Sequence, residues 1–338
     1  MANYPFCTID PSVGVVAVPD NRLETLSKIS GSADILPAVV EFVDIAGLVK
    51  GASAGEGLGN KFLANIRETN MIAEVVRIFE DSDIHHVSGG VDPLGDIETI
   101  NLELIMADAE TVSKRLNNLE RDVKRGDKAA VAEKAVLDKL LPHLEAGHLA
   151  NALGMTDDEL KLVKGLHLLT MKPFLYVCNK KQDAFNLDEH NDDRWQELLQ
   201  FFADTGSEYV VVDAGMEHEL KDLSDDEKNE FRREYGAQDS GVESLIRAAY
   251  HRLGLMSYFT TGEKETRAWT VPIGSTGPEA GAAIHTDFKD KYIRAQVVAF
   301  EDLVAAGSKA AARDQGKLRT EGKDYIVQDG DLIEFMHS

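Results

Sequence analysis

Phe42-Val-Asp-Ile-Ala-Gly-Leu-Val-Lys-Gly-Ala-Ser-Ala-Gly-Glu-Gly-Leu-Gly-Asn-Lys-Phe62 is the stretch that decides the fold of this chain of 338 residues. The mostly apolar run 38–43 predicts a buried strand that delivers Asp44 at its end. Asp44-Ile-Ala-Gly47 is a D-x-x-G sequence, which P-loop nucleotide hydrolases use to hold Mg²⁺ and to contact the γ-phosphate. An ordinary strand-end aspartate is the competing interpretation, because Asp92-Pro-Leu-Gly95 repeats D-x-x-G without a preceding strand.

A glycine-rich loop, residues 51–59, follows the D-x-x-G sequence. It does not match the dinucleotide fingerprint G-x-G-x-x-G, because Asn60 stands where Gly55 and Gly57 would require a third glycine. We interpret the loop as a mobile linker in preference to a phosphate cradle. Mobility after D-x-x-G is what a nucleotide-sensing switch needs.

Polar residues also follow the apolar run 173–178, which predicts another strand. Asn179-Lys180-Lys181-Gln182 lies close to the N-K-x-D sequence of GTPases, whose Asp carboxylate accepts two N–H groups of guanine. The neutral amide of Gln182 cannot accept twice in this way, so GTP specificity would require a shift of register to Asp183. A polar turn at a strand end is the alternative interpretation.

Other catalytic patterns are weak or absent in the sequence. The loop Tyr4-Pro-Phe-Cys-Thr8 could bring a hydroxyl to Mg²⁺, but an isolated loop threonine carries little information. No G-x-x-x-x-G-K-[ST] or H-E-x-x-H occurs in the printed residues, and we interpret His85-His86 as a surface or packed pair. The sequence therefore supports nucleotide chemistry through its strand-end motifs alone.

The remaining pattern predicts an α/β fold with a helical insertion and a small C-terminal unit. Strands that alternate with helices are typical of a parallel sheet covered on both faces. The predicted strands of the α/β part lie at residues 13–18, 38–43, 72–79, 173–178 and 208–212. Two long amphipathic helices, 96–124 and 128–144, predict an antiparallel hairpin around Gly126-Asp127. In the C-terminal unit we predict strands at 269–273, 292–298, 325–327 and 332–335, the last two around a turn at 328–331.

Composition excludes several classes of function. The net charge of −23 argues against general coating of nucleic acid or of anionic membranes, because the mean field repels phosphate. Residues 257–338 carry only three of these excess negative charges, which indicates a separate C-terminal module. Two cysteines exclude a disulfide framework, and no apolar run reaches the ~20 residues of a membrane span. Without a recognisable signal peptide, we expect a cytoplasmic protein.

These pieces in this order resemble the YchF/Obg-like ATPases, a branch of the translation-factor-related P-loop GTPases. Residues 3–11 are similar to the switch I of that family, and residues 42–68 to its switch II and the helix after it. The resemblance continues through Arg267-Ala-Trp-Thr-Val271 to residues 322–331, which are similar to the C-terminal TGS domain. It covers essentially the whole chain.

The resemblance implies a Ras-like P-loop NTPase sheet, an inserted helical hairpin and a TGS domain of β-grasp fold. It also implies a ribosome-associated ATPase with an OBG-type G domain, in which Thr8 and Asp44 serve Mg²⁺ and Gly47 the γ-phosphate. The base side of the nucleotide site would be formed by Phe79, Asn179, Lys180, Gln182, Asp213, Ala214 and Gly215. Leu48 stands where many GTPases keep a water-orienting Gln, so no catalytic side chain is assigned.

Two departures from the family pattern modify these expectations. Gln182 replaces the glutamate that ends the base motif of the family. The strand, P-loop and helix that should precede Tyr4 are not among the printed residues, and that strand is central in a Ras-like sheet. We therefore expect unpaired inner strand edges, weak ATP binding by this chain, and a truncated member arising from a mis-assigned start, a fragment or a natural deletion.

Four segments make up the predicted organisation: 1–82 and 169–256 form the nucleotide-binding domain, 83–168 the hairpin and 257–338 the TGS domain. The first hypothesis is ATP hydrolysis coupled to ribosome binding, in translation or stress regulation. The second is a non-catalytic ribosome adaptor, and the third is a GTPase. The partners expected are the ribosome (large subunit or 70S) and ATP or GTP, with no membrane, no DNA and a monomeric chain. Candidate ribosome or RNA contacts are the basic residues Lys309, Arg313, Lys317, Arg319 and Lys323.

Overall fold

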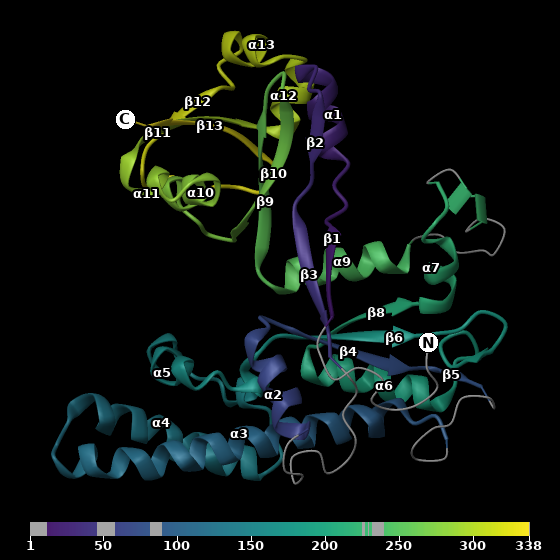
Figure 1. Cartoon of the computed structure of the whole chain (residues 1–338), viewed down its shortest axis with the longest axis vertical. Helices are drawn as coiled ribbons and strands as arrows, with labels where there is room; N and C mark the ends of the chain where they lie inside the picture. The colour runs from purple at the N-terminus through teal and green to yellow at the C-terminus, as the bar shows by residue number, and fades with distance from the viewer. Residues whose placement is uncertain are drawn as a thin grey trace. The chain divides into compact units, whose positions relative to one another are not determined.

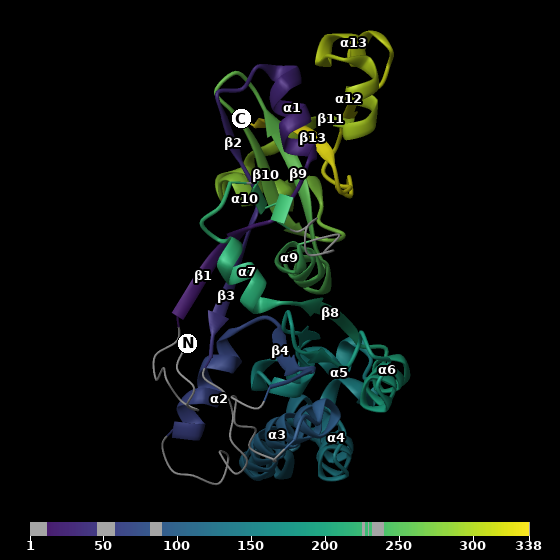
Figure 2. The same cartoon turned by 90° about the vertical axis from the view of Figure 1, so that its right-hand side faces the viewer.

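The computed structural model describes residues 12–45, 58–81, 90–224, 227–228, 230–231 and 240–337, and Figures 1 and 2 give two views of it. The chain divides into two compact units. Unit 1 comprises Met1–Val13 and Val43–Leu245, and unit 2 comprises Gly14–Phe42 and Ile246–Ser338. In the described part of the chain, no helix is both long and apolar enough to cross a bilayer.

A parallel sheet of three strands forms the centre of unit 1, as the alternating pattern predicts. The strands are β4 (Ile72–Arg77), β6 (Phe174–Asn179) and β8 (Glu208–Val212), in the order β4-β6-β8. All residues of β6 except the last are buried. A strand that is buried on both faces needs apolar side chains on both, so its sequence is an almost continuous apolar run. Arg77 pairs with Asn179 and Asn179 pairs with Val212, so the three carboxyl ends meet at one edge of the sheet.

Three helices cover one face of this sheet, as Figure 1 shows: α2 (Leu58–Glu68), α3 (Pro93–Lys124) and α6 (Asp193–Thr205). Their apolar faces meet the sheet in one core cluster. That cluster includes Ile66, Val76, Ile97, Leu104, Leu169, Tyr176, Cys178, Leu198 and Phe202. Burial of this apolar surface is the main stabilising contribution to unit 1.

The helical insertion agrees with its predicted pattern. It consists of α3, α4 (Lys128–Glu145), the 3₁₀ turns η2 (Ala150–Leu153), η3 (Lys164–Leu166) and η4 (Leu169–Met171), and α5 (Asp157–Val163). Figure 2 shows α3 and α4 side by side. The Asp127 carboxylate accepts the Ala130 N–H at 2.9 Å, and Thr156 with Glu159 forms a capping box at the start of α5.

A buried carboxylate joins the insertion to the sheet. Asp108 of α3 is 0% exposed and accepts the N–H of Leu169 at 2.8 Å and that of Thr170 at 2.7 Å. The Thr170 hydroxyl donates to it as well, at 2.7 Å. Burial raises the pKa of Asp108, while these hydrogen bonds and the charge of Arg67 oppose that rise. Asp108 thus fixes η4, the segment that leads directly into β6.

The strand predicted at 72–79 is two strands, because the chain changes partner at Ile78. β4 pairs with β6, whereas β5 (Phe79–Glu80) pairs with β7 (Phe185–Asn186). β6 pairs with one edge of β4, and no strand among the described residues pairs with the other edge. The side chain of Val75 on β4 is 69% exposed. β3 (Val39–Asp44) pairs with β1 (Ser12–Ala17) in a separate two-stranded sheet.

Unit 2 is a six-stranded mixed sheet in the order β12-β11-β13-β9-β10-β2. Its strands are β2 (Asp34–Leu36), β9 (Leu255–Thr261), β10 (Glu265–Pro272), β11 (Tyr292–Ala299), β12 (Arg319–Glu321) and β13 (Asp331–His337). The helices of this unit are α1 (Arg22–Ser30), α10 (Gly277–Ile284), α11 (Asp287–Lys291), α12 (Phe300–Ala306) and α13 (Lys309–Asp314). Tyr258, Ala280, Val297 and Ile333 belong to its core.

The predicted hairpin of 325–327 with 332–335 is wrong. Residues 325–327 form a loop with a single bridge between Thr276 and Ile326, and β13 pairs with β11 and β9 instead. The loop is held by the Val327 N–H, which donates to the carbonyl of Ser275 at 3.0 Å. Long-range pairing therefore overrides the local turn signal.

The N-terminal segment 14–42 belongs by its contacts to unit 2, which the sequence pattern does not reveal. β2 extends the sheet by parallel pairing with β10. Arg22 of α1 bonds to Asp20 at 2.7 Å and to Asp329 at 2.6 Å, and its guanidinium lies 4.9 Å from the ring centre of Phe259. The predicted module boundaries after residues 82, 168 and 256 stay predictions.

Glu74 is a buried carboxyl group in the core of unit 1. It lies on the same face of β4 as Val76, and its Oε2 has no hydrogen-bond partner among the described residues. Burial, with a smaller contribution from the charge of Asp96 on α3, raises the pKa of Glu74 to about 8. The protonated form is therefore the stable one in the folded protein at neutral pH.

We predict that Glu74 makes unit 1 less stable as the pH rises. The folded state binds the proton of Glu74 more tightly than the unfolded chain does, because the reference pKa in the unfolded chain is 4.5. This proton therefore stabilises the folded state fully below pH 4.5, and the stabilisation is lost as the pH approaches 8. The expected slope in the free energy of unfolding is up to about 1.4 kcal/mol per pH unit. Glu74→Gln should flatten that slope.

Urea unfolding measures this slope through the fluorescence of Trp195, in a Trp269→Phe background that silences the tryptophan of unit 2. Glu197→Gln, at an exposed position of α6, is the matched control and should behave like the parent protein. An identical slope in the Glu74→Gln variant would show that Glu74 titrates normally.

Candidate nucleotide site

Two loops at the carboxyl edge of the unit 1 sheet are joined by reciprocal hydrogen bonds. Asn179 ends β6, and its Oδ1 accepts the N–H of Ala214 at 3.1 Å. Asp213 follows β8, and its Oδ2 accepts the N–H of Gln182 at 2.7 Å. Its Oδ1 accepts the N–H of Met216 at 2.9 Å and so caps α7 (Ala214–Leu220). Each loop thus supplies the side chain that orders the other.

This arrangement leaves hydrogen-bond donors for a ligand. Asn179 uses its amide oxygen for Ala214, and in the described residues no protein acceptor takes its NH₂ group. Both oxygens of Asp213 are occupied by backbone N–H groups, so its role is to position the loops. The carboxyl end of parallel strands is also where open α/β sheets bind ligands.

The lysines of the first loop are held by carboxylates. Lys180 donates to Glu189 at 2.8 Å, and Lys181 forms an ion pair with Asp81. Partial burial opposes it, but the hydrogen bond and charge of Glu189, aided by nearby Asp188 and Asp213, raise the pKa of Lys180. The same bond to Lys180 lowers the pKa of Glu189. Lys180 therefore keeps its charge throughout the physiological range.

Asn186 is a supporting residue that the sequence interpretation missed. It is 2% exposed, its Oδ1 accepts the N–H of Lys181 at 3.0 Å, and its Nδ2 donates to the carbonyl of Lys181 at 2.9 Å. It closes a turn in which Asp183 has a left-handed φ of 59°. The sequence signal that could have identified it is an asparagine shortly after N-K-K-Q-D, because asparagine side chains commonly close turns by bonding to nearby backbone groups.

Phe79 lies next to this loop through backbone pairing. It pairs with Asn186 across β5 and β7, and only 6% of it is exposed. The Arg77 guanidinium lies 4.7 Å from its ring centre, and Arg77 Nε donates to the Phe79 carbonyl at 2.8 Å. Its predicted base contact stays a prediction, because the ring is covered in this conformation.

Of the residues predicted to bind Mg²⁺ or the γ-phosphate, Asp44 is among those that the structure describes. Asp44 is exposed at the end of β3, whereas Thr8 and Gly47 lie outside the described residues. Within the described ranges, no group of three or more His, Cys, Asp or Glu residues could hold a metal ion. One carboxylate is nevertheless enough for Mg²⁺ when substrate phosphates and water complete its shell.

Comparison with known proteins identifies the family. A family model named YchF-GTPase_C, described as a protein of unknown function (DUF933), matches residues 255–338, and MMR_HSR1, described as a 50S ribosome-binding GTPase, matches residues 1–107. The Bacillus subtilis protein "Ribosome-binding ATPase YchF" is 50% identical over 334 residues, which cover 99% of this chain and 91% of the relative. This chain belongs to the YchF family.

Further relatives agree with this assignment. The Escherichia coli O157:H7 protein of the same name is 48% identical over 335 residues, with the same two coverages. The solved structure of the Schizosaccharomyces pombe YchF GTPase has a TM-score of 0.85 at 34% identity and covers 99% of this chain and 90% of that one. YchF membership confirms the expected α/β P-loop GTPase domain, helical insertion and C-terminal TGS-like domain.

The basic residues predicted to contact RNA are largely neutralised. Lys309 forms an ion pair with Glu334, and Lys317 lies 3.1 Å from Asp302. Arg319 lies 3.3 Å from Glu321 and 3.8 Å from buried Asp331. Among the described residues, Arg313 and Lys323 have no ion pair and are exposed, so they are the stronger candidates within this set.

We predict that Asp213→Ala loosens both loops of this YchF site. The N–H groups of Gln182 and Met216 lose their acceptor, which costs about 1–3 kcal/mol each where water cannot replace it. Amide hydrogen exchange at these two residues should accelerate at least tenfold.

Asp222→Ala, at an exposed position just after α7, is the matched control and should leave both exchange rates unchanged. Unaltered protection of the Gln182 and Met216 amides in Asp213→Ala would contradict the positioning role of Asp213.

Proposed function

We propose that this chain is a ribosome-binding ATPase, as its curated YchF relatives are named, and that it hydrolyses ATP in the cytoplasm as a monomer. The observation that carries the proposal is the reciprocal bonding of Asn179 and Asp213 at the carboxyl edge of the sheet, in a chain 50% identical to such a relative. This edge is where the fold binds a ligand.

The reaction is phosphoryl transfer to water, in which catalysis comes from positioning and from electrostatic stabilisation. Bound Mg²⁺ would neutralise charge developing on the phosphates. In the proposed site Asp44 and Thr8 would hold Mg²⁺, and the Gly47 N–H would contact the γ-phosphate. The base would be held by Phe79, Asn179, Lys180, Gln182, Ala214 and Gly215, in loops that Asp213 positions. No side chain is proposed as the catalytic base, because Leu48 is apolar.

Gln182 favours adenine over guanine in this proposal. Guanine presents two adjacent N–H donors on its pairing edge, and a carboxylate can accept both. An amide offers one donor and one acceptor, which matches adenine better. ATP is therefore the proposed substrate, and GTP is the alternative.

An adaptor role is the second candidate, supported by Arg313 and Lys323. These exposed cations stand in the nearly neutral C-terminal segment, where the overall acidic charge of the chain opposes RNA binding least. Ribosomal RNA on the large subunit or the 70S particle is the proposed contact.

Co-sedimentation with purified ribosomes tests the partner. We expect the chain to pellet with 70S particles or large subunits, and the Arg313→Glu/Lys323→Glu variant to pellet several-fold less at moderate salt, because both charges reverse. The matched control is Lys28→Glu/Lys264→Glu, two exposed lysines of unit 2 outside the basic set.

Two outcomes would count against these ideas separately. Absence of the parent chain from the ribosome pellet would refute the ribosome partner. Normal pelleting of Arg313→Glu/Lys323→Glu would refute the RNA contact at these two residues while leaving the partner in place.

A further inference from the structure

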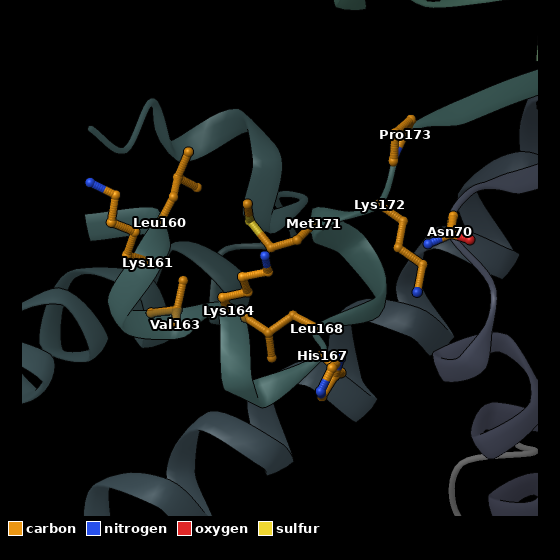
Figure 3. A pocket seen from close by; sticks show the side chains of 10 residues that line it. All are labelled: Asn70, Leu160, Lys161, Val163, Lys164, His167, Leu168, Met171, Lys172 and Pro173. Atoms are coloured by element: carbon orange, nitrogen blue, oxygen red, sulfur yellow. The ribbon is translucent and has the colours of Figure 1, made fainter. Parts of the chain in front are cut away.

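A cavity of about 360 Å³ opens in unit 1 beside the helical insertion, and Figure 3 shows the side chains around it. It lies where α5 and η3 meet the chain that enters β6. Its volume is at the lower end of the range for ligand pockets, about 300–1,000 Å³. The residues lining it are Asn70, Leu160, Lys161, Val163, Lys164, His167, Leu168, Met171, Lys172 and Pro173.

The cavity is separate from the proposed nucleotide site. Lys172 and Pro173 stand at the amino end of β6, whereas Asn179 ends the same strand. At about 3.3 Å per residue, the strand alone separates the two places by roughly 20 Å. A ligand here would therefore not overlap with a nucleotide bound at the other end of the strand.

The lining combines an apolar floor with a basic rim. Leu160, Val163, Leu168, Met171 and Pro173 provide aliphatic surface. Three lysines and one histidine surround it, and no carboxylate of the described residues lines it, although the chain has 59 acidic and only 36 basic residues. A concentration of positive charge in so acidic a chain selects for an anionic ligand.

Two of the lysines are available to a ligand. Lys164 is exposed and has no ion pair among the described residues. Within the described ranges Lys161 pairs only with Asp158, and the two side chains are 74% and 90% exposed. Such surface pairs contribute about 0–1 kcal/mol, so an incoming carboxylate can replace Asp158 at little cost.

The walls of the cavity are held in place before any ligand arrives. Lys172 donates to the carbonyl oxygens of Arg67, at 3.1 Å, and of Thr69, at the carboxyl end of α2. Arg67 in turn donates to the carbonyl of His167 at 3.4 Å. Asp108 fixes Leu169 and Thr170 by accepting their N–H groups. A preformed site binds at a lower cost in conformational entropy.

We propose that this cavity docks an acidic peptide segment of a partner protein, with one bulky apolar side chain on the floor and carboxylates on Lys161 and Lys164. The volume accommodates one or two side chains and excludes a folded element. Single-stranded RNA is less well matched, because it stacks bases on aromatic rings and this floor is aliphatic.

Fluorescence anisotropy with the full chain tests the docking. The probe is a short fluorescein-labelled peptide of Asp and Glu around one Leu-Phe pair. Lys161→Glu/Lys164→Glu should weaken its binding at least tenfold, and replacement of Leu-Phe by Ser-Ser in the peptide should weaken it by a similar factor. The matched control, Arg121→Glu/Lys128→Glu, reverses two exposed cations of the hairpin away from the cavity and should bind normally.

A thermal unfolding midpoint equal to that of the parent protein shows that a variant remains folded. The proposal is overturned by absence of peptide binding to the parent chain, or by equal binding to Lys161→Glu/Lys164→Glu. Equal affinity for the Ser-Ser peptide also overturns it, because the floor then has no role. Binding of fluorescein-labelled oligouridylate through the same two lysines, without the peptide, assigns the cavity to RNA and overturns it too.

Discussion

Burial of the central strand β6 is the constraint on which unit 1 depends. Phe174 to Cys178 are buried on both faces, and the strand hydrogen-bonds to β4 on one side and to β8 on the other. Register is strictly fixed in such a strand, because a slip by one residue would exchange its two faces. At its carboxyl end, Asn179 consequently lies on the loop that bonds to the loop of Asp213. At its amino end, Lys172 and Pro173 line the cavity beside the insertion.

The contacts around α2 connect the helix that follows the D-x-x-G loop to the helical insertion. Arg67 of α2 donates to Thr111 of α3 at 3.2 Å, and Lys172 bonds to the last carbonyl groups of α2. Cations at the carboxyl end of a helix satisfy unpaired carbonyls and offset the helix dipole. Any displacement of α2 must therefore break these bonds or carry the insertion with it.

Local patterns predicted the parts of the fold that local forces decide. The hairpin of α3 and α4 and the strand 208–212 follow from the periodicity of their apolar residues. The pairing of β2 with β10 and the loop at 325–327 depend on partners far away in sequence, which no local pattern contains. At the site, Asn179 was predicted from its place at a strand end, whereas Asp213 was predicted only from the resemblance to the YchF/Obg-like family. Buried Glu74 and the carboxylates that neutralise Lys309, Lys317 and Arg319 become visible only when the sheets are assembled.

Photoaffinity labelling with 8-azido-ATP tests most directly whether the paired loops after β6 and β8 hold an adenine base, and it detects weak binding as well as tight binding. The account predicts that the label maps to residues 179–182 and 213–215, and that unlabelled ATP prevents labelling at lower concentration than GTP. Labelling elsewhere in the chain, or better protection by GTP than by ATP, would contradict it.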